Sequence, residues 1–305
     1  MRALAGKLKL NMALAVAALI VAAFGILWFV VGPRADESQA YRAPRLQGTM
    51  QPNLAGIWQA FTTANDDLQR HVARPARAMR AGPAGPVPMP EVLALGATGG
   101  VPGSQGVVDG NEIPYQAWAA AKKKENSENW LTSDPEIKCY LPGVPRATYL
   151  PYPFQIVQGT NKIMIIYEFD GAARSIHMDA VDPAPAESWM GHSVGRWEKD
   201  TLVVDVTAMN DKTWFDRAGN FHSDALHVVE RYTPLTPYHL MYEATIEDSK
   251  VFTRPWKIRM PLYRHIEADV QLLEYRCVEF VDELVYGHLR KVPLPRALTV
   301  LPVFP

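Results

Sequence analysis

Histidine and aspartate side chains are concentrated between residues 177 and 227, and their types suit catalysis or metal binding better than any others in the chain. His222 and Asp224 are two residues apart, so in an extended segment they would share one face and form half of a metal site. No H-x-x-x-H, H-E-x-x-H or facial-triad spacing accompanies them, and the sequence has no C-x-x-C-H for haem attachment. We therefore expect no metal and no other cofactor.

Hydroxyl groups adjoin two of these histidines, at His192-Ser193 and His222-Ser223. Neighbouring residues of a strand point to opposite faces, so neither pair places imidazole against hydroxyl. Gly191 to Gly195 reads G-H-S-V-G, but a nucleophile elbow needs a strand–turn–helix context, and here Gly195 opens a predicted hairpin. We expect no catalytic residues. The alternative is a small-ligand or hydrolase site in the loops at 177–227, formed by His177, His192, His222 and Asp224.

The elements that must position these side chains are predicted to be β-strands, because from residue 153 onward the apolar residues alternate or form short β-rich runs. The expected strands are Phe154–Gln158, Lys162–Phe169, Ala173–Met178, Gly195–Trp197, Thr201–Val206, Ala225–Tyr232, His239–Glu247, Phe252–Met260 and Val270–Phe280. Connections this short join antiparallel neighbours. The fold class is therefore mainly β, an antiparallel up-and-down barrel or a strongly curved sheet.

Charged residues alternate with apolar ones inside this block of strands. They are Glu168, Arg174, Arg196, Glu230, Arg231, Glu243, Arg254, Glu274 and Arg276. Their simplest role is in cross-strand ion pairs on the solvated face. Those that point inward instead would line a polar cavity for a small ligand.

One stretch of the strand block resembles a family signature. Residues 191–205 read GHSVGRWEKDTLVVD, which is similar to a motif of a large family of uncharacterised exported bacterial proteins. Its companions are the stretches 134–146, 153–158, 222–231 and 254–256, so the resemblance covers roughly residues 50–290. Lys199 stands where that family usually has glycine in the hairpin turn. The family has no established activity, so the resemblance implies a class of protein and no mechanism.

The N-terminal segment decides the expected location. Residues 12–32 are almost entirely apolar, long enough for a helix to cross the hydrocarbon core of a bilayer. A cleaved signal peptide is the alternative, but the apolar core is long and no A-x-A follows it. We expect an uncleaved single-pass anchor of the inner membrane, with residues 1–11 in the cytoplasm and the main domain in the periplasm. Small-residue spacings on this helix would suit helix packing: Ala13, Ala17, Ala18 and Ala22.

The cysteines and the composition fit an exported protein. Cys139 and Cys277 are the only two. We expect a disulfide between them, with two buried thiols as the alternative. The net charge of −1 gives no electrostatic reason to expect nucleic-acid binding.

The chain divides by composition into an anchor and three further regions. An extended Pro/Gly-rich belt at 33–150, with a strand at Leu54–Phe61 and a short helix near 115–130, precedes the β domain at 151–287, and a Pro-rich tail at 288–305 follows. The apolar side chains of the tail would dock on its own domain or on a partner. They are Leu298, Val300, Leu301, Val303 and Phe304.

Together these features favour a non-catalytic accessory subunit. Its partner would be an integral-membrane complex of the inner membrane, of respiratory or photosynthetic type, contacted through the helix in the lipid bilayer and through the periplasmic domain. The rival is the tethered ligand-binding protein or hydrolase described above.

Overall fold

The computed structural model describes residues 41–74, 101–179 and 182–278. The chain divides into two units at residues 41 and 42, and the account below concerns the second. The predicted anchor at 12–32, its four alanines and the apolar residues of the tail lie outside the described residues. Within the described ranges, no helix has the length and apolar character needed to cross a membrane.

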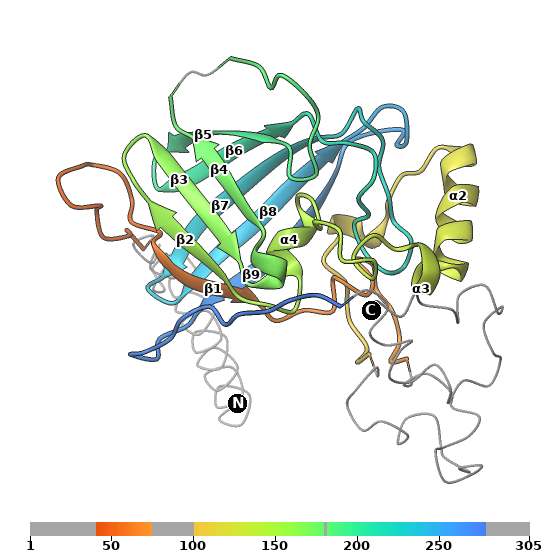
Figure 1. Ribbon diagram of the computed structural model, residues 1–305, viewed down its shortest axis with the longest axis horizontal. Coiled ribbons are helices and arrows are strands. Elements are labelled where there is room, and N and C mark those ends of the chain that lie inside the picture. The colour runs from red at the N-terminus through yellow and green to blue at the C-terminus, as the bar shows by residue number, and fades with distance from the viewer. Residues whose placement is uncertain (1–40, 75–100, 180–181, 279–305) are drawn as a thin grey trace, which may run out of the picture. The chain divides into compact units, whose positions relative to one another are not determined.

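Nine strands form a closed barrel in which each strand pairs with its sequence neighbour and β9 pairs with β1 (Figure 1). The strands are β1 Gly56–Ala60, β2 Phe154–Gln158, β3 Lys162–Tyr167, β4 Ala173–His177, β5 His192–Glu198, β6 Thr201–Thr207, β7 His227–Thr236, β8 His239–Glu247 and β9 Trp256–Arg264. The mainly β prediction is confirmed. The strand at 56–60, within the predicted belt, closes the barrel between β2 and β9.

Whether a strand side chain points into or out of the barrel follows the period-two pattern of the sequence. In β7 and β8 the burial alternates residue by residue, so that side chains such as Val228, Tyr232 and Tyr242 fill the barrel. Trp58 and Trp256 are also buried, as expected for core tryptophans. The interior is a packed core, and its apolar content is the main stabilising term of the fold.

The prediction that all strands run antiparallel is wrong at one pair. β4 and β5 are parallel and share only two residue pairs, Ile176 with Ser193 and His177 with Val194. The connection at residues 178–191 is long enough to carry the chain back across the barrel before β5 begins, which a parallel pair requires. The two strands therefore form a seam in an otherwise antiparallel wall.

The predicted strand at Val270–Phe280 is also wrong over its described part. Residues 270–278 have no regular secondary structure and lie across the outside of the barrel. Tyr275 packs against Tyr152 and Phe169 at ring-centroid distances of 4.6 and 5.7 Å, and the backbone N–H of Leu273 donates to Glu168. Ring contacts and a hydrogen bond to the Glu168 side chain hold this segment in place, instead of the backbone hydrogen bonds of a strand pair.

Of the described helices, two lie beside the barrel and one packs into its core (Figure 1). The predicted helix near 115–130 is present as α2, Ala117–Glu128, followed by α3, Trp130–Ser133, and α4, Arg146–Tyr149. Short 3-10 turns occur at Asp109–Asn111 and Phe169–Gly171. In Figure 1, α2 and α3 lie to one side of the barrel, and α4 is close to the strands. All four residues of α4 are buried, so this short helix is part of the core.

The disulfide between Cys139 and Cys277 is present. It joins the turn after α3 to the segment that follows β9, across 138 residues of sequence. The expected pairing is confirmed, and neither thiol is free. Because the cross-link closes so long a loop, it restricts the unfolded chain strongly.

Candidate functional site

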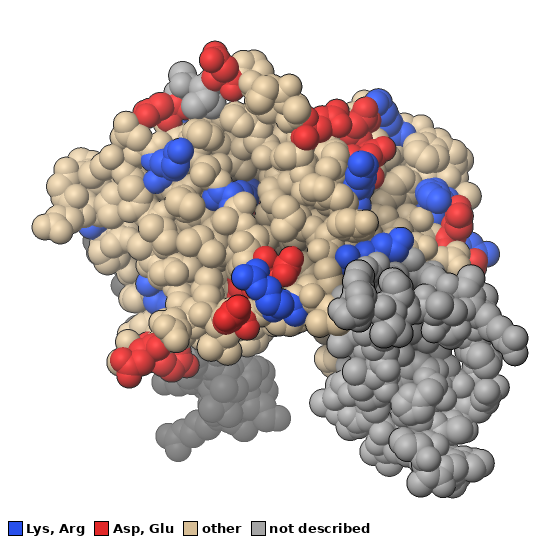
Figure 2. Space-filling model, in the orientation of Figure 1, with Lys and Arg blue, Asp and Glu red and all other residues tan. Residues whose placement is uncertain are grey.

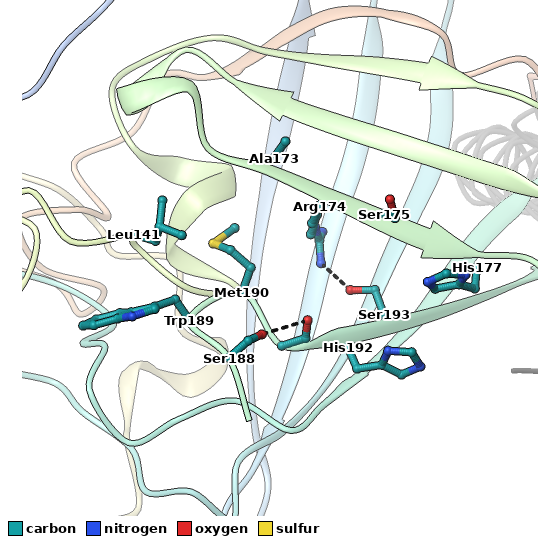
Figure 3. Close-up of a pocket in the computed structure, with 11 residues that line it drawn as sticks. Leu141, Ala173, Arg174, Ser175, His177, Ser188, Trp189, Met190, His192 and Ser193 are labelled. Carbon is teal, nitrogen blue, oxygen red and sulfur yellow. Dashed lines mark hydrogen bonds between the residues drawn. The ribbon is translucent and has the colours of Figure 1, made fainter. Parts of the chain in front are cut away.

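A cavity of about 390 Å³ opens at the β4–β5 seam (Figure 3). We call it the seam cavity. Its lining residues are Leu141, Ala173, Arg174, Ser175, His177, Ser188, Trp189, Met190, Gly191, His192 and Ser193. The volume lies within the range of cavities that hold small organic ligands.

The cavity exists because the chain before β5 turns away from β4. Ser188 pairs with the segment after β6, donating its N–H to Ala208 and accepting from Asn210. Gly191 makes the turn with a φ of 66°, and a Cβ there would lie 2.8 Å from the backbone oxygen of Thr207. Only glycine fits so close an approach in this conformation. The β4 backbone at 173–175 therefore faces an opening where a neighbouring strand would otherwise lie.

The floor of the seam cavity is the guanidinium of Arg174. Nη1 lies 2.7 Å from Oε2 of Glu230 and donates to Ser193 at 3.3 Å, while Nε and Nη2 donate to the hydroxyls of Tyr167 and Tyr232. Tyr232 and Tyr242 in turn donate to Oε1 of Glu230. Arg174 and Glu230 thus point inward, which was the alternative to the solvated face, and they form an ion pair inside the barrel.

The electrostatics of this floor keep it ionic. Burial alone would lower the pKa of Arg174, but Glu230, together with Tyr167 and Tyr232, more than offsets burial and holds that pKa above its usual value. Burial, and then the charge of Glu230, raise the pKa values of Tyr232 and Tyr242, so both hydroxyls keep their protons and donate. The floor is therefore a fixed arrangement of one cation, one anion and neutral donors.

Two of the predicted site residues come together at the edge of the cavity. The rings of His177 and His192 stack with centroids 5.4 Å apart, and Figure 3 shows them side by side, beyond Ser193 as seen from Trp189. Burial, Lys162 and His192 lower the pKa of His177, in that order. Nε2 of His192 is buried and has no hydrogen-bond partner among the described residues. An unpaired buried nitrogen is costly, and in native proteins it needs an explanation.

The other two predicted site residues lie elsewhere. His222 is buried, with Nδ1 2.8 Å from the carbonyl oxygen of Ser223 and Nε2 2.6 Å from the hydroxyl of Thr213. Asp224 is on the surface, 2.6 Å from Nζ of Lys250. The four-residue constellation does not assemble. His222 serves a buried loop, and Asp224 a surface ion pair.

A second buried polar cluster was missed by the sequence analysis. Arg146 of α4 makes a bidentate pair with Asp134, at 2.7 and 2.8 Å, and Arg217 makes one with Glu136 at 3.0 Å. These pairs tie α4 and the 207–224 loop together. Their residues are satisfied by one another, which marks them as structural. The Asp134 to Arg146 spacing inside the quoted motif 134–146 was the available signal.

Within the described ranges, neither Ser193 nor a cluster of ligand side chains is arranged for nucleophilic or metal chemistry. Ser193 lies within β5 and accepts a hydrogen bond from Arg174, with no elbow around it. Among the residues that the structure describes, no group of three or more His, Cys, Asp and Glu side chains is placed to hold a metal ion. The seam cavity has two features of a binding site, apolar walls and a few oriented polar groups.

No protein-family model, no curated protein and no solved structure matches this chain. The resemblance of residues 191–205 to an exported bacterial family therefore stays a prediction. The functional argument depends on the site itself.

Proposed function

We propose that this protein is a small-ligand-binding protein whose binding site is the seam cavity. The observation that carries the proposal is the interrupted β4–β5 pairing, which opens the barrel wall directly above the Arg174–Glu230 pair. An opening in a packed barrel costs apolar contacts and hydrogen bonds. A ligand in the opening would restore both.

The direct test is ligand-induced stabilisation of the full chain in a panel of small neutral, anionic and cationic compounds. Compounds that bind the folded state raise the unfolding temperature in proportion to their saturation. Ser175→Trp places a large side chain in the opening and should abolish the shifts. Lys257→Trp, on the exposed face of β9, is the matched control and should retain them. If no compound stabilises the parent protein, or if Ser175→Trp keeps every shift, the proposal is wrong.

The accessory-subunit role is the second candidate, and one surface favours it. Phe61, Tyr238 and Tyr263 are large side chains, 64, 55 and 37 % exposed. Phe61 and Tyr263 pack with ring centroids 5.5 Å apart, and the carbonyl of Tyr238 accepts from the N–H of Arg264. Exposed contiguous apolar groups mark protein or membrane contacts. We propose that an integral-membrane complex of the inner membrane covers this aromatic patch.

That role is tested by gentle detergent extraction of native membranes, followed by size-exclusion chromatography. Co-elution with a large integral-membrane complex is expected, and Tyr238→Glu should weaken it because a charge in an apolar interface is costly. Lys257→Glu, outside the patch, should leave it intact. Elution of the parent protein alone at about 34 kDa would contradict the subunit role and leave the ligand-binding proposal untouched.

A further inference from the structure

The ionisable side chains that line the seam cavity are all basic. Arg174, His177 and His192 are among its lining residues, and none of the lining residues is Asp or Glu. Lys162 of β3 pairs directly with His177 of β4, and its charge contributes to the lowered pKa of His177. At neutral pH the lowered pKa leaves His177 uncharged, as an N–H donor, while Lys162 supplies a positive charge beside it.

Acidic groups on the neighbouring strand already have partners. Asp205 of β6 ion-pairs with Arg196 and lies 3.2 Å from Nε2 of His227. Glu230 beneath the floor is paired with Arg174. Figure 2 shows acidic and basic side chains mixed over the face it presents, without a large field of one sign. The bias toward basic groups is thus local to the cavity edge.

Ser193 supplies an oriented donor at the cavity floor. Its side chain is buried, and its oxygen accepts a hydrogen bond from Nη1 of Arg174 at 3.3 Å. Because the guanidinium donates to that oxygen, the hydroxyl hydrogen must point elsewhere. The burial patterns of β4 and β5 place Ser193 on the inner face of the barrel wall and His177 on the outer face, so this hydroxyl belongs to the ionic floor and not to the edge that carries the histidines.

The remaining wall is apolar. Leu141, Trp189 and Met190 lie together on the side away from the histidines (Figure 3). Trp189 is held by stacking on Tyr140, with ring centroids 4.9 Å apart. The cavity thus has the two histidines at one end, with Lys162 beside His177, and apolar surface at the other.

From this arrangement we infer that the ligand is a small carboxylate with an apolar body. The carboxylate would accept from the His177 ring, near the charge of Lys162, and the body would lie against Leu141, Trp189 and Met190. Hydrogen bonds to an ionised acceptor are the stronger kind. This inference rests on the proposed ligand-binding function and specifies the class of ligand.

The test compares two nearly isosteric probes, phenylacetate and phenylacetamide, by isothermal titration of the full chain in detergent at neutral pH. We expect phenylacetate to bind about tenfold more tightly, the effect of one charge-assisted hydrogen bond. The variant Lys162→Gln/His177→Gln should bring the two probes close to equal affinity. Lys257→Gln, an exposed lysine on β9, is the matched control and should keep the preference.

The outcomes separate this inference from the function on which it rests. If both probes bind the parent equally, the inference is overturned while the ligand-binding function stands. If neither binds and no compound of the wider panel stabilises the protein, the function itself is wrong. If the double variant keeps the full preference, Lys162 and His177 are not its source, and the inference is overturned in that form.

Discussion

Replacing Arg174 with methionine should destabilise the barrel by about 3–5 kcal/mol, the usual cost of leaving one partner of a buried ion pair without the other. Glu230 has no exposed surface, and its Oε2 lies 2.7 Å from Nη1 of Arg174. Methionine keeps much of the apolar stem and removes the charge. The carboxylate would then keep only the hydroxyls of Tyr232 and Tyr242 as donors.

Urea unfolding followed by tryptophan fluorescence measures the loss, with the free energy obtained by linear extrapolation. The double variant Arg174→Met/Glu230→Gln should recover about 2 kcal/mol relative to Arg174→Met, because no charge is then left buried. Arg196→Met is the control: the side chain of Arg196 is 52 % exposed, so the expected loss is below about 1 kcal/mol. A loss at Arg174 no larger than that at Arg196 would refute the reasoning.

Three further predictions concern single features of the fold. Burial and the nearby Asp67 raise the pKa of Asp216 from 3.8 to about 7. The folded state therefore keeps a proton that the unfolded chain releases, and the free energy of unfolding should fall as pH rises from about 4 to about 7. Asp216→Asn should flatten that part of the profile in urea titrations, and parallel profiles would contradict the assignment. The variant Cys139→Ser/Cys277→Ser should lower the free energy of unfolding by up to about 5 kcal/mol, because the cross-link closes a loop of 138 residues. Thermal unfolding with and without reductant measures this loss. An unchanged unfolding temperature would contradict the prediction. Lys199 has a φ of 56° in the β5–β6 turn, a left-handed conformation that glycine adopts without strain. Lys199→Gly should therefore stabilise the protein by about 1 kcal/mol, whereas Lys199→Ala should not. Equal effects of the two substitutions would rule out backbone strain as the cause.

The strands were predictable where the sequence alternates and the connection is a tight turn. β8 has the predicted bounds, and β5 and β6 form the predicted hairpin around Lys199 and Asp200. Burial of one face fixes such strands locally, so their own residues are enough to reveal them. The direction of β5 was not predictable in this way, because a long connection allows either orientation.

The site was harder to predict because it depends on where distant strands meet. Arg174 and Glu230 were both singled out, but which face they occupy depends on their register within the barrel. His177 and His192 meet because β4 and β5 are parallel, and that pairing was predicted wrongly. His222 and Asp224 are two residues apart in sequence, yet His222 is buried and Asp224 is on the surface, so they have different roles. The sequence pattern also led to a wrong prediction at residues 270–278, where ring packing takes the place of strand pairing.

The most direct test of ligand binding at the seam is a titration observed at Met190. Selective ¹³C labelling of the methionine methyl groups gives one NMR signal for each, and Met190→Leu assigns the signal of the cavity. Met260, buried in the barrel core, serves as an internal reference. The account predicts that compounds which stabilise the protein shift the Met190 methyl saturably and leave Met260 unchanged. Stabilising compounds that leave Met190 unmoved would place binding elsewhere and contradict the account.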